Sequence, residues 1–188
     1  MKSIAVFCGA NKGNKPYFEE AATELGKTLA ERGIRVVFGG GSVGLMGVVA
    51  DAVLAHGGDI TGIITHQLHG LELGHPGVKD MIHVETMSER RVLLLQGTDG
   101  VITLPGGYGS MDEHFEALTL AQLQQYRKPI GLLNVRGYYD SLLQMLDNMV
   151  DNGFLKPANR HLCLDAPDVS GLLEKMTTFE YQAMKKWL

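Results

Sequence analysis

The chain has 188 residues, with 17 basic and 21 acidic side chains and a net charge of −4 at pH 7, a length that fits one α/β domain over residues 1–188. Its charges are spread along the chain without the basic stripe of a nucleic-acid-binding protein, so we expect no nucleic-acid partner. Two cysteines are too few for a disulfide framework and no apolar segment reaches the roughly 20 residues that span a bilayer, so we expect a cytoplasmic protein outside the membrane.

Short apolar runs rich in β-branched residues alternate with longer helical patterns, which is typical of βαβ units. The expected strands are residues 3–8, 34–38, 60–65, 81–86, 100–104 and 129–135. The expected helices are residues 17–32, 45–56, 88–96, 111–126 and 138–152. We also expect a last helix over residues 176–188, docked on the domain or on a partner subunit.

Several of the expected strands, such as the VVF and LLNV runs, are apolar without alternation. Parallel strands covered by helices on both faces have this pattern. We therefore predict a single, doubly wound parallel sheet in a three-layer, Rossmann-like α/β fold. Right-handed crossovers bring the carboxyl ends of such strands to one edge of the sheet, where ligands bind.

Glycine accounts for 24 of the 188 residues, nearly twice its average share of about 7%. Two glycine blocks lead from a strand into a helix, GGGSVGLMG at residues 39–47 and PGGYGS at residues 105–110. The first contains GxGxxG but lacks the acidic residue that binds ribose in NAD sites, and GxxxxGK[ST] does not occur. Conventional NAD, ATP and GTP sites are therefore disfavoured.

Both glycine blocks offer free backbone N–H groups at a helix N-terminus, an arrangement that binds anions. The hydroxyl of Ser110 is available to the same anion in the second block. The alternative is that these glycines only let the helices pack closely on the strands. Two such blocks at one edge of one sheet favour anion binding.

Two charged residues lie near the starts of the helices that follow the strands at 81–86 and 100–104, namely Arg90 and Glu113. Ser110 and Glu113 also have the spacing of a capping box, and an arginine in an early helical turn is ordinarily a solvated surface charge. If the two strands are neighbours, however, both side chains face one ligand. A cation and a carboxylate beside an anion site suit a phosphorylated sugar.

Three histidines, His66, His69 and His75, occupy the segment between the third and fourth expected strands. Their spacing matches no zinc template, so we expect no metal site. Cys8 ends the first strand without a nearby motif that supplies a base, and we interpret it as a small buried residue rather than a nucleophile.

Three segments together resemble the LOG family of cytokinin riboside 5′-monophosphate phosphoribohydrolases. The family signature PGGxGTxxE is similar to PGGYGSMDE at residues 105–113, the family's MHERK is similar to MSERR at 87–91, and GGGSVGLMG at 39–47 is its other characteristic block. Shorter matches, including GYY at 137–139, extend the likeness over roughly residues 4–155. Departures include Ser88 for histidine, Ser110 for threonine, and Ala10 and Asn11 for paired serines.

This resemblance implies hydrolysis of the N-glycosidic bond of AMP or an N6-modified AMP, giving free base and ribose 5-phosphate without a metal or organic cofactor. It implies that Arg90 and Glu113 are catalytic and that the protein is a homodimer. The other residues that we expect to bind substrate are Ser42, Gly44, Met87, Gly107, Tyr108, Gly109, Ser110 and Glu116. A non-catalytic nucleotide or cofactor carrier is the alternative, and a pyridoxal phosphate-dependent decarboxylase is a third possibility with no lysine in either glycine block.

Overall fold

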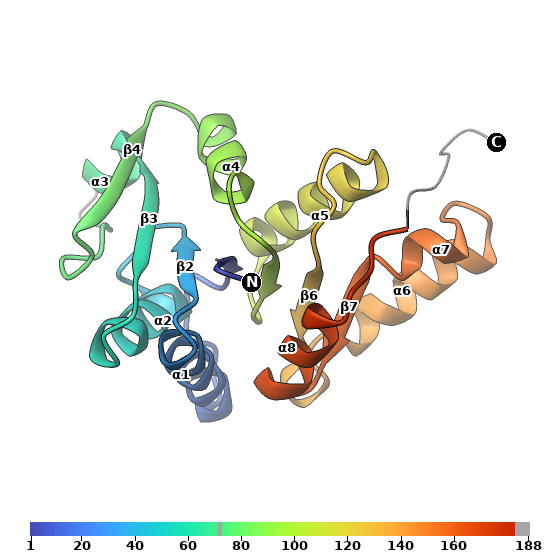
Figure 1. The fold of residues 1–188 in the computed structure, drawn as a ribbon, viewed down its shortest axis with the longest axis horizontal. Helices are drawn as coiled ribbons and strands as arrows, with labels where there is room; N and C mark the ends of the chain where they lie inside the picture. Colours follow the sequence, from blue (N-terminus) through green and yellow to red (C-terminus); the bar gives the residue numbers. More distant parts are fainter. Residues whose placement is uncertain (71–72, 183–188) are drawn as a thin grey trace.

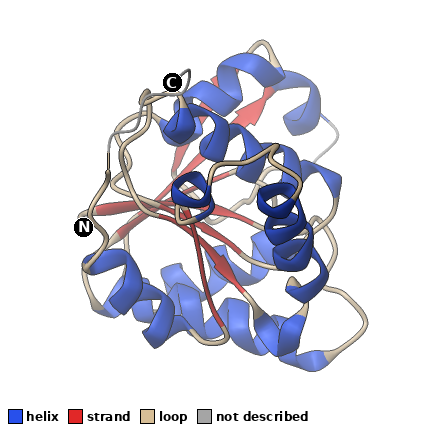
Figure 2. Cartoon of the chain, turned by 90° about the vertical axis from the view of Figure 1, so that its right-hand side faces the viewer, coloured by secondary structure: helices blue, strands red, loops and turns tan. Residues whose placement is uncertain are grey.

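A computed structural model of the chain describes residues 1–70 and 73–182. Seven parallel strands form one sheet in the order β4-β3-β2-β1-β5-β6-β7. Helices cover the sheet on both faces, which Figure 2 shows as strands enclosed between two helical layers. The predicted doubly wound, three-layer fold is confirmed.

The elements follow one another as expected for repeated βα units (Figure 1). The strands are β1 (Ser3–Phe7), β2 (Arg35–Phe38), β3 (Ile60–Thr65), β4 (Asp80–Val84), β5 (Val101–Thr103), β6 (Ile130–Leu133) and β7 (Cys163–Ala166). The helices are α1 (Pro16–Glu31), α2 (Gly44–Ala55), α3 (His66–Gly70), α4 (Met87–Leu95), α5 (Tyr108–Gln122), the 3₁₀ helix η1 (Val135–Gly137), α6 (Asp140–Asp151), α7 (Pro157–Arg160) and α8 (Val169–Thr177).

Alternate residues of the central strands pack into two separate hydrophobic cores, one on each face of the sheet. Ile4 and Val6 of β1 pack with α1, α2 and α8 on one face, whereas Ala5 and Phe7 pack with α4 and α5 on the other. All four are at most 2% exposed. Burial on both faces explains why the strands read as unbroken apolar runs.

The C-terminal part departs from the prediction. β7 and α8 were not expected, because the CLDA segment of β7 is short and contains an aspartate at a position of intermediate burial. The expected last helix over 176–188 is wrong as far as the described residues test it: α8 ends at Thr177 and residues 178–182 are not helical. Residues 183–188 of that prediction lie outside the described part of the chain.

The condition stated for Arg90 and Glu113, that the strands before them are neighbours, is not met, because β3, β2 and β1 lie between β4 and β5. The chain winds outward from β1 to β4 and returns through α4 to place β5 beside β1. The winding direction reverses there, and loops that leave in opposite directions open a crevice at the carboxyl edge of the sheet. No helix in the described residues combines the length and apolar character needed to cross a bilayer.

Candidate active site

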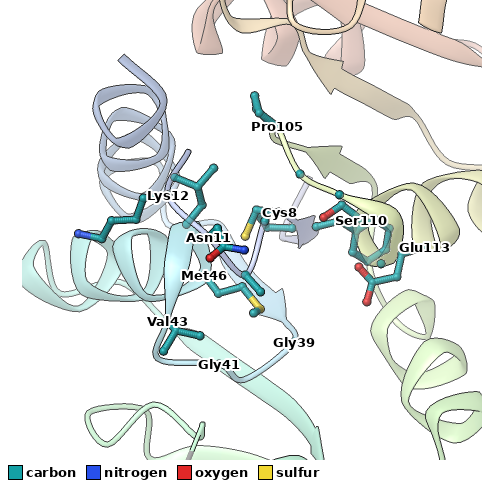
Figure 3. Close-up of a pocket in the computed structure, with 18 of the residues that line it drawn as sticks. Cys8, Asn11, Lys12, Gly39, Gly41, Val43, Met46, Pro105, Ser110 and Glu113 are labelled. Atoms are coloured by element: carbon teal, nitrogen blue, oxygen red, sulfur yellow. The ribbon is translucent and has the colours of Figure 1, made fainter. Parts of the chain in front are cut away.

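A cavity of about 520 Å³ opens at the carboxyl ends of β1, β2 and β5, where the strand order reverses. Its volume lies within the roughly 300–1,000 Å³ typical of small-molecule sites. Figure 3 shows Ser110 and Glu113 on the α5 side of the cavity, with Asn11 and Met46 across from them and Cys8 between. The apolar side chains among its described lining residues include Val43, Leu45, Met46, Ile64, Leu68 and Leu73.

Arg90 reaches this cavity from the first turns of α4. A capping box between Thr86 and Glu89 starts the helix, so its first turn is well defined. The guanidinium Nε of Arg90 donates to the carbonyl of Ile63 at 2.9 Å and Nη2 donates to that of Gly39 at 3.1 Å. Arg90 is only 7% exposed, so it is not a solvated surface charge.

Gly39 is required by this placement of Arg90. A Cβ atom added at Gly39 would overlap Nη2 of Arg90. The first glycine of the GGG block therefore leaves space for the arginine and, through its carbonyl, accepts a hydrogen bond from it. This contact joins the loop after β2 to α4, two segments that are remote in sequence.

Glu113 lies in the second turn of α5 and faces Arg90. Nη1 of Arg90 is 3.5 Å from Oε1 of Glu113. The capping box is not formed, because α5 begins at Tyr108, its N-cap is Gly107, and the N-cap has no side-chain hydrogen bond. Ser110 thus lies inside the helix rather than at its cap.

Burial dominates the electrostatics of Glu113. Loss of hydration raises the pKa of its carboxyl to about 7, while the nearby positive charge of Arg90 lowers the pKa by a smaller amount. The neighbouring acidic groups Asp112 and Glu116 raise it further. A carboxyl group with a pKa near 7 can both hold and release a proton at neutral pH, which is the property of a general acid or base.

The PGGYGS segment presents the N-terminus of α5 to the same cavity. Gly106, Gly107, Tyr108, Gly109 and Ser110 are all among its lining residues. The first N–H groups of a helix have no intrahelical partner and, with the helix dipole, favour an anion. Ser110 is buried, whereas the side chain of Tyr108 extends into solvent and is 98% exposed.

The GGGSVGLMG block lines the cavity through Gly39, Gly41, Val43, Leu45 and Met46. Ser42 and Gly44 are not among the described lining residues. The N–H of Ser42 donates to the carbonyl of Leu73 at 2.7 Å, so it is occupied within the protein. Gly44 has a φ of +65°, and a Cβ there would overlap the backbone of Ala10.

Two further predicted residues, Met87 and Glu116, are not among the described lining residues of the cavity. Met87 is 44% exposed at the first position of α4. Glu116 pairs with Arg91, with Oε2 3.0 Å from Nε. Their contact with a substrate stays a prediction.

Sequence reasoning assigned no role to the polar lining residues Lys12 and Tyr138, and it noted Asn11 only as a departure from the family pattern. Asn11 and Lys12 come from the loop after β1 and Tyr138 comes from the turn after β6. The only signal was their position after strands of a parallel sheet, together with the likeness of Tyr138 to a family block. Lys12 pairs with Glu19, Nζ to Oε2 at 2.8 Å.

Two buried ionisable groups near the site are held neutral. Burial, and to a smaller extent the charge of Glu113, raise the pKa of the Cys8 thiol far above its usual range, which disfavours a thiolate nucleophile. Burial lowers the pKa of His114 to about 4, and its ring lies between Thr103 and Cys163. Over residues 1–70 and 73–182, no group of three or more His, Cys, Asp or Glu side chains is arranged to hold a metal ion.

The chain is similar to enzymes from plants. It is 44% identical over 180 residues to the cytokinin riboside 5′-monophosphate phosphoribohydrolase LOG7 of Arabidopsis thaliana, covering 96% of this chain and 83% of that one. It is 43% identical over 179 residues to the probable cytokinin riboside 5′-monophosphate phosphoribohydrolase LOGL9 of Oryza sativa subsp. japonica, covering 95% and 79%.

Solved structures share the fold. The X-ray structure of TM1055 superposes with a TM-score of 0.74 at 26% identity and covers 95% of this chain and all of that one. The molybdenum cofactor carrier protein of Chlamydomonas reinhardtii superposes with a TM-score of 0.69 at 21% identity, covering 93% and 95%. At that identity the second likeness concerns the fold alone.

A family model described as "Possible lysine decarboxylase" matches residues 46–176, which is more than half of the chain. The curated relatives add similarity over nearly its whole length. The resemblance inferred from the motifs is thereby confirmed. The chain belongs to the LOG family.

Proposed function

We propose that this protein hydrolyses the N-glycosidic bond of a nucleoside 5′-monophosphate, AMP or an N6-modified AMP, to free base and ribose 5-phosphate. The observation that carries the proposal is the pairing of buried Arg90 with partly buried Glu113 beside the open N-terminus of α5 in one cavity. The names of the plant relatives agree with this chemistry.

In this scheme the 5′-phosphate binds the N–H groups of residues 107–110 and the hydroxyl of Ser110, which suits a dianion at a helix N-terminus. Glu113, in the second turn of the same helix, then lies on the ribose side. Glycoside cleavage passes through a state with positive charge on the sugar. The carboxylate of Glu113 stabilises that charge or takes a proton from the attacking water.

Arg90 acts on the leaving group. Water adds its oxygen to C1′, the C1′–N bond breaks, and the bonding electrons leave with the base, which gains negative charge until it is protonated. Because the backbone carbonyls of Gly39 and Ile63 fix the guanidinium, its remaining N–H donors are preorganised for that charge.

The place of Gly107, Tyr108, Gly109 and Ser110 in the lining of the cavity supports their proposed contact with the substrate. For the four predicted residues outside the described lining, substrate contact stays a prediction. These residues are Ser42, Gly44, Met87 and Glu116.

The test is incubation of the protein with AMP, an N6-prenylated AMP, GMP and CMP, followed by separation of free base and ribose 5-phosphate. Release of both products from a purine nucleotide, and its loss in Glu113→Gln, support the proposal. Binding of the nucleotides without release of base from any of them overturns it and favours a carrier.

The residues that line this cavity give little support to a decarboxylase function. A decarboxylase of the pyridoxal phosphate type needs a lysine for a Schiff base. Lys12 is the lysine among the described lining residues, and its ammonium pairs with Glu19 at the rim. A protein-bound aldimine absorption band after addition of pyridoxal phosphate, lost in Lys12→Arg, would revive this function.

We also propose that the protein is a cytoplasmic homodimer. Its two cysteines are free, which suits a reducing compartment. On α4, Val92 is 61% exposed and Met87 is 44% exposed, and a partner subunit would cover these two apolar side chains. Sedimentation equilibrium tests the dimer, and a monomer mass at micromolar concentration overturns it.

A further inference from the structure

Two consecutive tyrosines after β6 bind the backbone of the PGGYGS segment. The hydroxyl of Tyr138 donates to the carbonyl of Gly106 at 2.7 Å, and that of Tyr139 donates to the carbonyl of Leu104 at 2.7 Å. Tyr139 is 3% exposed, whereas Tyr138 is 47% exposed at the edge of the cavity. Neither hydroxyl is used by the proposed reaction.

The turn before these tyrosines fixes their positions. Arg136 and Gly137 both have left-handed backbones, with φ of 52° and 75°, which turns the chain sharply after β6. The side chain of Asn134 then accepts from the N–H of Tyr139 at 2.7 Å and donates to Asp140 at 2.8 Å. A left-handed arginine is unfavourable and persists where its surroundings determine it.

Tyr138 has a second support on its ring. Phe18 of α1 packs edge-on against it at a centroid distance of 5.7 Å, and Tyr139 does so at 4.8 Å. The phenol that reaches Gly106 is therefore packed against two rings, Phe18 of α1 and the neighbouring Tyr139. Such a donor can hold a backbone group in one orientation.

The group that Tyr138 holds is a peptide between two glycines. In a planar trans peptide the carbonyl of Gly106 and the N–H of Gly107 point in opposite directions. A flip of this peptide would exchange the two and carry the φ of Gly107 from its present −100° to a positive value. Glycine adopts positive φ readily, so the chain itself does little to prevent the flip.

Residue 106 cannot carry a side chain that would restrain this peptide against the flip. A Cβ atom there would overlap the hydroxyl of Ser110 and lie 3.0 Å from the backbone nitrogen of Gly9. The restraint has to come from outside the segment. Tyr139 differs from Tyr138 in this respect, because the peptide after Leu104 leads into Pro105 and has no N–H to orient.

We propose that Tyr138 is a positioning residue for phosphate binding: its hydroxyl keeps the Gly106–Gly107 peptide in the orientation that offers an N–H, rather than a carbonyl oxygen, to the phosphate. This inference rests on the proposed function in one respect, that residues 107–110 bind the phosphate. Its test therefore measures binding and not turnover.

The test is calorimetric titration of wild type and Tyr138→Phe with ribose 5-phosphate and with adenine. One neutral hydrogen bond is worth about 1 kcal/mol, so the Kd for ribose 5-phosphate should rise about fivefold in the variant, with the Kd for adenine unchanged. The matched control is Tyr181→Phe, which removes an equally long bond from a tyrosine to a carbonyl, that of Ala121, away from the cavity. An equal Kd for ribose 5-phosphate in wild type and Tyr138→Phe overturns the proposal, as does absence of binding to wild type.

A double-mutant cycle with Gly107→Ala tests the flip itself. A Cβ at Gly107 meets no atom within 4 Å, and alanine disfavours the positive φ that the flipped peptide needs. The loss of affinity for ribose 5-phosphate caused by Tyr138→Phe should therefore be smaller in the Gly107→Ala background than in wild type. An equal loss in both backgrounds overturns the flip. If nucleotides are bound but not hydrolysed, the proposed function fails while these binding results still decide the role of Tyr138.

Discussion

Arg90 and Glu113 meet across the carboxyl edge of the sheet, with Nη1 3.5 Å from Oε1, although three strands separate the strands that precede their helices. The return of the chain through α4 brings them together. Their separation is at the long limit of a hydrogen bond, while Nε and Nη2 of the arginine donate to carbonyls at 2.9 and 3.1 Å. The contact therefore leaves the carboxylate free to turn toward a ligand.

Replacing Glu113 by glutamine should abolish most activity while preserving the fold. Glutamine keeps the size of the side chain but can neither carry negative charge nor take a proton. We expect kcat for AMP to fall by about 10² or more, the usual scale for a lost acid or base, with nucleotide binding retained. Steady-state kinetics and calorimetry measure the two effects. Glu31→Gln, at an exposed pair with Lys27, is the control, and wild-type turnover by the Glu113 variant would remove it from the mechanism.

The rate should depend on pH through the same carboxyl group. Burial raises the pKa of Glu113 to about 7, so the carboxylate form grows as pH rises through neutrality. If the ionised form is the active one, kcat/KM should increase about tenfold per pH unit below pH 7 and level off above it. Carbon-13 NMR of the glutamate carboxyls, with Glu113 assigned by its loss in Glu113→Gln, gives the pKa directly. A midpoint near the ordinary glutamate value would contradict the burial argument.

The contribution of Glu113 to the free energy of unfolding should decrease as pH rises, whereas the rate should increase. A carboxyl whose pKa is higher in the folded state than its ordinary 4.5 stabilises the fold fully below pH 4.5, and that contribution is lost as pH rises through about 7. Relative to wild type, the free energy of unfolding of Glu113→Gln should thus increase with pH across this window. At about 1.4 kcal/mol per pKa unit, the increase is at most about 3.5 kcal/mol. Urea denaturation over the window measures it, and a constant difference between the two proteins would be the contrary result.

A methyl group at Gly39 should displace Arg90. The Cβ of Gly39→Ala would overlap Nη2, so the guanidinium must leave the carbonyls that orient it. We expect kcat/KM to fall by about 10² or more, the scale of a lost transition-state donor. Gly171→Ala in α8, where a Cβ finds ordinary contact distances, should keep wild-type activity. Equal activity of both variants would show that Arg90 does not need its present position.

Local pattern alone identified much of the fold. The GVITL run and the PGGYGS segment predict a strand followed by a helix with an open N-terminus, because apolar β-branched residues and glycines specify backbone states locally. β7 was not predicted, because a four-residue strand with partly exposed residues shows little hydrophobic periodicity in the sequence. The motifs also carried the family resemblance, which depends on residue identity rather than geometry.

What the sequence by itself determined was the succession of parallel βα units, the two glycine blocks and the identity of Arg90 and Glu113 as candidates. Only the tertiary structure decided that β4 and β5 lie apart, that Arg90 is buried against the carbonyls of Ile63 and Gly39, and that Tyr138 holds Gly106. Hydrophobic periodicity records which face of an element is buried, but not which neighbour buries it. Hydrogen bonds between segments remote in sequence, and the pKa that burial creates, therefore appear only when the chain is folded.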